Sequence, residues 1–453
     1  MNLQRKVDVQ AFLDEQRFSR FHILLFVLCF LIIALDGMDT GAMGYIAPSL
    51  IQEWHLSRAA LGPVLSATLV GIGFGAMVVS PFADRIGRKR VLIGSVFAFG
   101  VCSVASAFAQ SLEMLATLRF LTGIGLGAAV PNAVALMAEY APTRIRGTVV
   151  NAMLVGFAAG NGLGGLMTAW LIPRFGWHGV LVVGGVAPVL LTLALVPLLP
   201  ESVKFLVANR RPREDALDIL GRLAPGARLG DVHLVCEEDA GHGRKSPLSE
   251  LFRERYAVGT CLIWLCYFMC MVILYLVNSW LPTLFTTSGY SLQESTVTSS
   301  LFHLGGCAGI LLAGFLTDRF PPARVVAAYF LAAAVLVLVI GYSGAHAGLT
   351  TMIVIVGMAI SGASASMSPL AAHYYPTTSR VTGIAWMLGM GRFGGVAGTM
   401  GGAWLLGIGW AFGAIFSLLA IPAVIAAICL FLLGRNGPPQ QEADFPGAAM
   451  VEH

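Results

Sequence analysis

Long apolar runs alternate with short polar breaks along almost the whole chain. A helix that spans a membrane needs about 20 mostly apolar residues. Twelve runs of this kind can be read, at 21–50, 59–82, 91–110, 112–138, 148–171, 178–199, 256–280, 296–317, 322–343, 348–371, 381–405 and 410–433. The pattern therefore predicts an all-α integral membrane protein with twelve transmembrane helices.

Longer polar stretches divide these runs into two sets of six. We expect a cytoplasmic segment over 1–20, a six-helix bundle over 21–200, a central cytoplasmic loop over 201–255, a second six-helix bundle over 256–433 and a cytoplasmic tail over 434–453. The tail is rich in Gly, Pro and Glu, a composition typical of disordered segments.

The composition agrees with a lipid environment and argues against several classes of protein. Hydrophobic residues make up 57% of the chain and charged residues only 11%, whereas a soluble domain carries about 25% charged residues. No tract rich in Lys and Arg suggests binding to nucleic acid. The eight cysteines lack metal-ligand spacing, and the phosphate-binding pattern G-x-x-x-x-G-K-[ST] is missing. We therefore expect no metal, no cofactor, no ATP-driven step and no enzymatic activity.

Lysine and arginine positions predict the orientation, because cytoplasmic loops are enriched in both residues. With the N-terminus inside, only Arg58 and Arg174 of the 28 basic residues fall in outer loops, and only Arg119 and Arg392 fall within helices. The reverse orientation would place nearly all of the others outside. Both termini are therefore expected in the cytoplasm, and the chain is expected to cross a bacterial cytoplasmic membrane many times.

The two halves repeat each other at a constant distance along the chain. Asp84 and Arg85, after the second run, match Asp318 and Arg319, which lie 234 residues later. The same spacing joins Pro48 to Pro282, Tyr140 to Tyr374, Pro142 to Pro376, Arg146 to Arg380, Thr148 to Thr382, Gly160 to Gly394 and Gly164 to Gly398. Two related halves can rock about a central site and expose it to each side in turn. Duplicated packing in a channel or membrane-embedded enzyme is the alternative.

The break after the second run is dense in charge. Residues 83–90 read Ala-Asp-Arg-Ile-Gly-Arg-Lys-Arg, which resembles the signature loop of the major facilitator superfamily, with Ser80 where that family usually has Gly. Clustered charges beside a glycine turn can close the cytoplasmic side, although simple enrichment of cytoplasmic loops in basic residues would also explain them. Glu139 lies close in sequence to Arg144 and Arg146 and suggests a salt bridge there, with a proton site as the alternative. The residues expected in this cytoplasmic gate are Asp84, Arg85, Arg88, Glu139, Arg144, Arg146, Asp318 and Arg319.

The fourth run carries a cation, Arg119, followed by Gly123 and Gly127 on the same helical face. An arginine in hydrocarbon needs a carboxylate or carbonyl partner, and the glycines let another helix approach closely. The stretch resembles the second signature of the same superfamily, which implies that Arg119 takes part in proton coupling. A purely structural ion pair is the alternative.

Two carboxylates, Asp36 and Asp39, lie three residues apart in the first run and share a helical face. Two acids this close in a membrane are not both ionised at low cost, so at least one is expected to hold a proton. The stretch Asp-Gly-Met-Asp resembles a motif of the aromatic acid:proton symporters within the superfamily, which implies a role in proton coupling. Alternatively, one aspartate pairs structurally with Arg119 or Arg392.

The eleventh run holds a lone cation, Arg392, among glycines. A planar guanidinium binds carboxylate through two hydrogen bonds, so Arg392 is the candidate for the substrate carboxylate. Its alternative role is that of a structural partner for Asp36 or Asp39. His303 suits a packing role or a proton relay. The other residues considered for an aromatic pocket are Tyr45, Phe74, Tyr275, Trp280, Phe302, Trp386 and Phe393, and with His303 and Arg392 we retain Tyr45, Phe302, Trp386 and Phe393 as the substrate site.

The resemblance extends over nearly all of 20–435 and implies a substrate class that composition does not. It implies a monomeric symporter, surrounded by lipid, that imports an aromatic carboxylate such as benzoate, a hydroxybenzoate or protocatechuate together with protons. An uncoupled facilitator or an exporter of another organic acid or a sugar is the alternative. Pro200-Glu201-Ser202 also occurs in sugar porters, but their Arg-rich loop after the eighth helix is absent here, so sugar transport ranks lower.

Overall fold

A computed structural model gives the arrangement of most of the chain. The described residues are 5–16, 18–209, 211–223, 232–235, 251–252, 256–317, 319–343, 348–376 and 379–436. Ten helices within them are long and apolar enough to cross a membrane, by length and composition. Asp318 and most of the tail predicted over 434–453 lie outside the described residues.

Over its described residues, the first half forms six helical spans. Its helices are α2 (Arg20–Glu53), α3 (Arg58–Phe74), α5 (Arg88–Ser106), α6 (Leu112–Tyr140) and α7 (Arg146–Leu198). α7 supplies two spans, because Gly176 interrupts it with a φ of 64° that residues with a side chain rarely adopt. α2 packs on α7, and both α3 and α5 pack on α6.

The second half forms six spans over its described residues. Its helices are α11 (Ala257–Thr287), α12 (Leu292–Thr317), α13 (Pro322–Ser343), α14 (Leu349–Tyr374), α15 (Arg380–Gly407), α16 (Phe412–Leu418) and α17 (Ala420–Asn436). α16 and α17 follow each other closely and together make the last span. The predicted membrane fold of twelve helices in two six-helix bundles is therefore confirmed.

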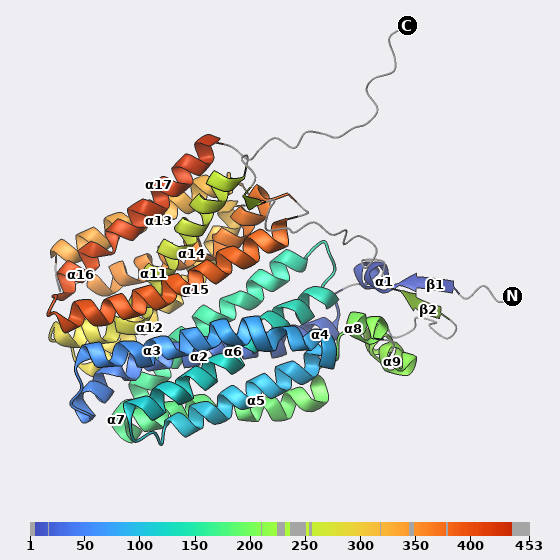
Figure 1. Ribbon diagram of the computed structural model, residues 1–453, viewed down its shortest axis with the longest axis horizontal. Coiled ribbons are helices and arrows are strands. Elements are labelled where there is room, and N and C mark those ends of the chain that lie inside the picture. Colours follow the sequence, from blue (N-terminus) through green and yellow to red (C-terminus); the bar gives the residue numbers. More distant parts are fainter. Residues whose placement is uncertain are drawn as a thin grey trace, which may run out of the picture.

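The two bundles lie side by side with their helices roughly parallel (Figure 1). They meet where α2 contacts α11, α3 contacts α15 and α7 contacts α12. The repeat spacing of 234 residues also relates helix ends: α2 ends at Glu53 and α11 at Thr287, α3 begins at Arg58 and α12 at Leu292, α6 ends at Tyr140 and α14 at Tyr374, and α7 begins at Arg146 and α15 at Arg380. The sequence repeat is thus a repeat of helix boundaries.

One end of the double bundle, called the basic face below, holds the starts of α2, α5 and α7 at Arg20, Arg88 and Arg146. The other end, called the opposite face, holds the end of α2 at Glu53 and the start of α3 at Arg58. Because α2 runs from the basic face to the opposite face, a residue's number along α2 gives its depth in the bundle.

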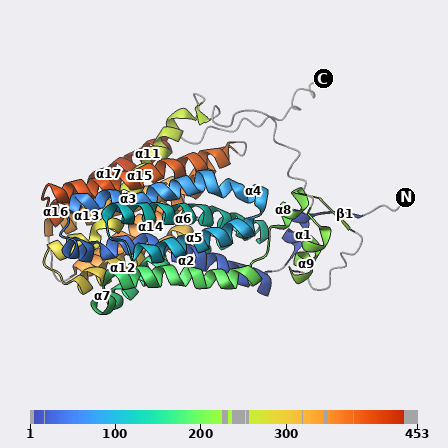
Figure 2. The same cartoon turned by 60° about the horizontal axis from the view of Figure 1, so that its bottom comes forward.

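The basic face carries small elements within the segments that the sequence pattern marks as polar (Figures 1 and 2). The strand β1 (Arg5–Asp8) pairs in parallel with β2 (Val232–Val235), and the helices α1 (Val9–Glu15), α8 (Val203–Ala208) and α9 (Arg213–Leu223) lie beside them. Apolar side chains such as Leu13 and Leu220 are buried there. Burial of these side chains explains why short polar-flanked segments adopt regular structure.

The second span is less regular than the run at 59–82 predicts. α3 ends at Phe74 and is followed by η1, a π-helical turn (Gly75–Val79), by η2, a 3₁₀ turn (Ser80–Phe82), and by α4 (Ala83–Ile86). Pro81 lacks a backbone N–H and cannot continue the α-helical hydrogen-bond pattern. Gly87, with a φ of 104°, then turns the chain into α5.

Glycines set how closely α2 lies on α7. Gly37, between Asp36 and Asp39, lies against the backbone carbonyl of Phe157, and Gly160 of α7 lies against that of Ala34. A Cβ at either glycine would overlap the facing carbonyl oxygen. The glycine of the Asp-Gly-Met-Asp stretch therefore has a packing role, which fixes the depth and direction of both aspartates.

Candidate functional site

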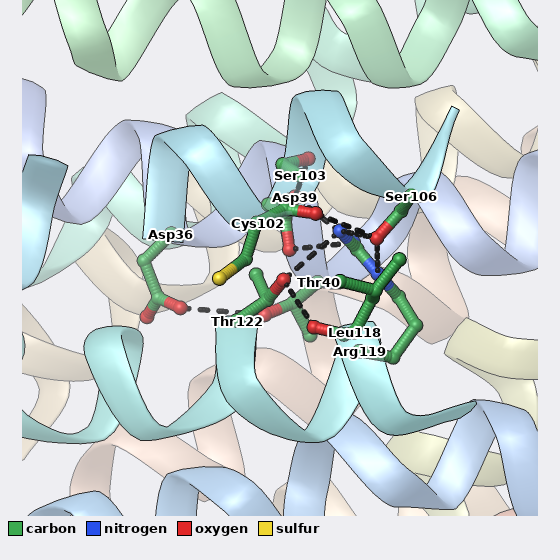
Figure 3. Close-up of polar contacts among 9 residues, drawn as sticks. All are labelled: Asp36, Asp39, Thr40, Cys102, Ser103, Ser106, Leu118, Arg119 and Thr122. Atoms are coloured by element: carbon green, nitrogen blue, oxygen red, sulfur yellow. Dashed lines mark hydrogen bonds and ion pairs between the residues drawn. The ribbon is translucent and has the colours of Figure 1, made fainter. Parts of the chain in front are cut away.

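A buried ion pair joins α2 to α6 (Figure 3). The Nη1 atom of Arg119 lies 3.2 Å from each carboxylate oxygen of Asp39. The Ser103 hydroxyl on α5 donates to the same carboxylate over 2.7 Å. The side chains of Arg119 and Asp39 are 0% and 1% exposed, so each charge depends on these protein partners in place of water.

Hydroxyl groups hold the rest of the Arg119 guanidinium. Its Nε and Nη2 atoms donate to Ser106 Oγ over 3.1 and 2.8 Å, and Nη2 also donates to Thr122 Oγ1 over 3.0 Å. The two hydroxyls donate in turn to the backbone carbonyls of Cys102 and Leu118. Asp39 and Arg119 thus form a closed network, which corresponds to the structural alternative considered for both residues.

Asp36 lies one helical turn before Asp39 but has different surroundings. Its carboxylate accepts a hydrogen bond from Thr40 Oγ1 over 3.3 Å, and the residue is 8% exposed. None of the ion pairs among the described residues includes Asp36. It interacts electrostatically with Asp39 and with Arg392 of the second half.

Arg392 lies on α15 at the boundary between the halves. Its guanidinium interacts with the phenol of Tyr275 and electrostatically with Tyr267, both on α11. Gly391 packs against Tyr267 and Gly395 against Tyr275, so the glycines beside Arg392 bring α15 close to α11. The side chain is partly exposed, and no ion pair among the described residues includes it. Arg392 therefore has hydrogen-bond donors left for an anion.

Two aromatic residues predicted for the substrate site point elsewhere. Trp386 and Phe393 are seven residues apart on α15, which places them on one helical face, and they are 46% and 68% exposed. Trp386 stacks on Trp264, with ring centroids 5.7 Å apart. The structure brings Arg392 together with Asp36 and Tyr275, and it does not bring Phe393 to the same side of the helix.

The remaining predicted substrate residues lie in buried positions of the bundle. The Tyr45 hydroxyl donates to the backbone oxygen and to Oδ1 of Asn161, over 3.2 and 3.1 Å. Phe302 is 0% exposed and lies edge-on to His303, which is 7% exposed. Tyr45 therefore contacts Asn161 within the first half and also Ser300 of α12 in the second half, and His303 is enclosed beside Phe302.

The two halves are joined toward the opposite face. Asn161 of α7 donates from Nδ2 to Oδ1 of Asn278 on α11 over 2.8 Å, and Gly44 of α2 lies against the Asn278 carbonyl. Gly62 of α3 lies against Ala403 of α15 near the same end. We call the Asn161–Asn278 hydrogen bond the interface bond. These contacts lie between Asp36 and the opposite face, so the conformation is closed on that side.

At the basic face, three of the predicted gate residues, Arg88, Glu139 and Arg146, form ion pairs within the first half. Arg88 Nη2 lies 2.7 Å from Glu139 Oε1, so Glu139 pairs with Arg88 and not with Arg144 or Arg146, its neighbours in sequence. Arg146 Nη2 lies 3.9 Å from Asp14 of α1 instead. These ion pairs link the first residue of α5 to α6, and the first residue of α7 to α1.

The other predicted gate residues lie in more exposed positions. Asp84, Arg85 and Arg144 are exposed. The guanidinium carbon of Arg319 lies 4.1 Å from the centroid of the Phe315 ring, and Asp318 lies outside the described residues. Among the described residues, none of the ion pairs includes Asp84, Arg85 or Arg319.

Sequence reasoning did not single out the hydroxyls around the aspartates, namely Thr40, Ser103, Ser106 and Thr122. Ser103 and Ser106 are spaced three apart in an otherwise apolar run, which places them on one helical face; that spacing was the available signal. Within the described residues, no group of three or more His, Cys, Asp or Glu side chains is placed to hold a metal ion.

Comparison with known proteins agrees with this arrangement. The model of the Major Facilitator Superfamily matches residues 29–352 and 263–449. The 4-hydroxybenzoate transporter PcaK of Pseudomonas putida is 44% identical over 431 residues, which cover 95% of this chain and 96% of that protein. The gallate transporter of Pseudomonas putida is 42% identical over 430 residues and 95% of both chains. These relatives confirm the prediction of a transporter and not an enzyme.

A solved structure shows the same fold at low sequence identity. The inward open conformation of the xylose transporter XylE from E. coli superposes with a TM-score of 0.75 at 18% identity, over 90% of this chain and 95% of that one. The fold, the family model and the close relatives agree with the resemblance carried by the loop at 83–90 and by the Asp-Gly-Met-Asp stretch. The chain belongs to the major facilitator superfamily and, within it, to the family of aromatic acid transporters.

Proposed function

We propose that this protein imports aromatic carboxylates, such as benzoate and hydroxybenzoates, into bacterial cells together with protons. The observation that carries the proposal is the position of Arg392 at the boundary between the halves, with no ion-pair partner among the described residues. The relatives named for 4-hydroxybenzoate and gallate support the substrate class, because both compounds join a benzene ring to one carboxylate.

The chemistry around Arg392 suits such a ligand. A guanidinium can donate two parallel hydrogen bonds to one carboxylate, and a lysine ammonium cannot reproduce that geometry. Tyr267 and Tyr275 of α11 lie near the guanidinium and offer ring surface and phenol groups to an aromatic substrate. Binding between the halves lets each half contact the ligand, as alternating access requires.

Asp36 provides a physical route to coupling. An ionised Asp36 interacts favourably with Arg392 and therefore competes with the substrate carboxylate for it. A proton on Asp36 removes that competition, so substrate binds more tightly to the protonated protein. Coupling of this kind is reciprocal, since substrate must then strengthen proton binding by the same factor. A tenfold effect corresponds to about 1.4 kcal/mol.

Asp39 and Arg119 take a different part in this proposal. Their pairing and the surrounding hydroxyls favour a charged, fixed pair over a carboxylate that takes up and releases protons. The pair holds α2 against α5 and α6 and so keeps Asp36 at the boundary between the halves. Of the two aspartates that the sequence offers as proton sites, we assign proton transfer to Asp36.

Proton coupling also supplies the driving force. A potential that is negative inside opposes the entry of an anion by about 2.3 kcal/mol per charge per 100 mV. One co-transported proton cancels this electrical cost, because the anion and the proton then cross together without net charge. A second proton would make the transported charge positive, so that the membrane potential drives entry. We assign the basic face to the cytoplasm of a bacterial inner membrane. The contacts toward the opposite face then close the protein to the outside.

Uptake into proteoliposomes tests the proposal. Radiolabelled 4-hydroxybenzoate is offered to vesicles that contain the purified protein, with and without an imposed gradient that is alkaline inside. We expect the gradient to drive accumulation above the outside concentration and a protonophore to abolish it. Equal concentrations inside and outside under both conditions would identify an uncoupled facilitator instead. Xylose, which lacks a carboxylate, is the control solute and should not enter.

A further inference from the structure

A small cavity lies against Thr40, whose hydroxyl bonds to Asp36, at the boundary between the halves. Hydroxyl-bearing residues from both halves line it, namely Thr40 of α2, Thr68 of α3 and Ser279 of α11. Tyr275 and Asn278 of α11 also line it. The cavity has room for about one water molecule. Met43, Gly44, Leu65 and Leu69 complete the lining, so the wall is partly apolar, and the hydroxyl, phenol and amide groups are the hydrogen-bond partners that it offers to one ordered water.

The cavity lies on one particular side of Asp36. Thr40 follows Asp36 by one helical turn toward the opposite face. Asn278, which closes the cavity from the second half, also makes the interface bond with Asn161. Separation of the halves at that bond would therefore open the cavity toward the opposite face, whereas Asp36 would stay at its inner end.

Two hydroxyls of the cavity, those of Thr68 and Thr40, can each form a further hydrogen bond. Thr68 is 4% exposed, and its Oγ1 has no hydrogen-bond partner among the described residues. A buried hydroxyl left unpaired destabilises a protein by about 1–3 kcal/mol, so a water in the cavity is its natural partner. The Thr40 hydroxyl uses its proton in the hydrogen bond that it donates to Asp36 Oδ1 over 3.3 Å. Its oxygen can still accept a hydrogen bond.

We propose that Thr40 passes protons between water in this cavity and Asp36, so that the cavity forms the last step of the proton path from the opposite face. This inference rests on the proposed function, because it assumes that Asp36 is the proton carrier. It adds a residue and a route to that function, and it explains why a threonine with a free acceptor follows Asp36 by one turn.

The transfer is balanced in atoms and charge. A hydronium ion, supplied by the bulk water on the opposite face, gives one proton to Thr40 Oγ1. At the same time the hydroxyl proton of Thr40 moves to Oδ1 of Asp36. The products are one neutral water, an unchanged threonine hydroxyl and a neutral carboxylic acid. Thr40 acts as a relay and keeps no net charge.

The charged and titratable groups around Asp36 agree with entry from this side. Asp39 on the same helix is held by Arg119 of α6, and Arg392 and Tyr275 approach from α15 and α11. The cation of Arg392 disfavours the approach of a hydronium ion from the substrate side. Thr40 and the cavity offer a hydronium ion a route to Asp36 that is lined by uncharged groups.

Substitution of Thr40 by valine tests the relay, because valine keeps the shape and removes the hydroxyl. For Thr40→Val we expect the initial rate of gradient-driven uptake to fall by about tenfold or more. We expect counterflow, the exchange of labelled for unlabelled substrate without a gradient, to stay within about twofold of the wild-type rate, because exchange needs no proton release. Thr40→Ser restores the hydroxyl and should restore gradient-driven uptake.

Two further variants separate the relay from general damage. Thr192→Val removes a buried hydroxyl that bonds only within its own helix, to Pro188, and should leave both assays unchanged. Thr68→Val removes the cavity hydroxyl that has no hydrogen-bond partner among the described residues and should slow gradient-driven uptake, as Thr40→Val does. If Thr40→Val does not fold or loses counterflow, Thr68→Val decides the question.

The outcomes distinguish this inference from the proposed function. Gradient-driven uptake at the wild-type rate in Thr40→Val, or in Thr68→Val when that variant decides, overturns the relay. Asp36→Asn is measured beside them: if it loses gradient-driven uptake while the threonine variants keep it, coupling at Asp36 stands without the relay. If Asp36→Asn itself keeps gradient-driven uptake, proton coupling through Asp36 is wrong, and the proposed function is contradicted together with the relay.

Discussion

Asp36 and Asp39 lie three residues apart on the same face of α2, but only Asp39 is paired with a cation, Arg119, at 3.2 Å. The difference arises from neighbouring helices, because α5 and α6 surround Asp39 with hydroxyl donors while Asp36 meets the second half. A single helical turn therefore separates a carboxylate in a closed network from one placed at the boundary between the moving halves. We assign a structural role to Asp39 and proton transfer to Asp36.

Neutralising Asp36 should separate exchange from accumulation. Asp36→Asn resembles the protonated carboxyl in shape and cannot release a proton. We therefore expect gradient-driven accumulation to be lost while counterflow persists. Both quantities are measured with labelled 4-hydroxybenzoate in the same vesicles. A variant that accumulates substrate against its gradient as the wild type does would remove Asp36 from the mechanism.

Neutralising Asp39 should affect stability first. Asp39→Asn leaves the charge of Arg119 buried without its carboxylate, and loss of one member of a buried ion pair destabilises a protein by about 3–5 kcal/mol. Thermal unfolding of the detergent-solubilised protein should register a large decrease in midpoint temperature. The double variant Asp39→Asn, Arg119→Gln should be more stable than the sum of the single changes predicts, because no unpaired charge remains. Additive effects would argue against the pair.

Substitution of Arg392 by lysine should weaken substrate binding. The change keeps the charge and loses the bidentate geometry, so the KM for 4-hydroxybenzoate should rise by about tenfold, equivalent to about 1.4 kcal/mol. Phe393→Leu is the matched control, because Phe393 is 68% exposed on another side of the helix and its truncation should leave the KM near the wild-type value. A KM that responds to Phe393 and not to Arg392 would move the carboxylate site.

Removal of the interface bond should favour opening toward the opposite face. A net hydrogen bond contributes about 0.5–1.5 kcal/mol, so Asn161→Ala should change the ratio of the two conformations by about two- to tenfold. A cysteine placed at Ser279, in a background without other reactive cysteines, reports opening through its rate of labelling by an impermeant maleimide. Faster labelling is expected in Asn161→Ala. Thr168→Ala, which removes a bond within α7 only, should label as the wild type does.

The helices were predictable from the sequence because apolar run length is a local signal, and the repeat was predictable because a constant spacing of matching residues can be read without a structure. Apolar run length determines which segments can span a membrane, and the spacing of 234 residues proved to be the spacing of helix ends. The exceptions have physical reasons. The turn near Pro81 interrupts the second span, and the short elements of the basic face form through contacts between the N-terminal segment and the central loop, which are distant in sequence.

The site was only partly predictable, because partners depend on how helices rotate against each other. The sequence singled out Asp36, Asp39, Arg119 and Arg392 as costly charges, but it left open which of them pair. Glu139 has two arginines near it in sequence and binds a third, Arg88, from another helix. The hydroxyl of Thr40 gave no sequence signal, since a threonine in an apolar helix commonly bonds to its own backbone.

Proton movement caused by substrate is the most direct measure of the central claim that Asp36 carries the proton. Wild-type protein is placed in weakly buffered vesicles, and the external pH is followed after 4-hydroxybenzoate is added. We expect the external pH to rise with the wild type, and not to rise with Asp36→Asn even though this variant still exchanges substrate. An equal rise with Asp36→Asn, or none with the wild type under conditions where it transports, would contradict this claim.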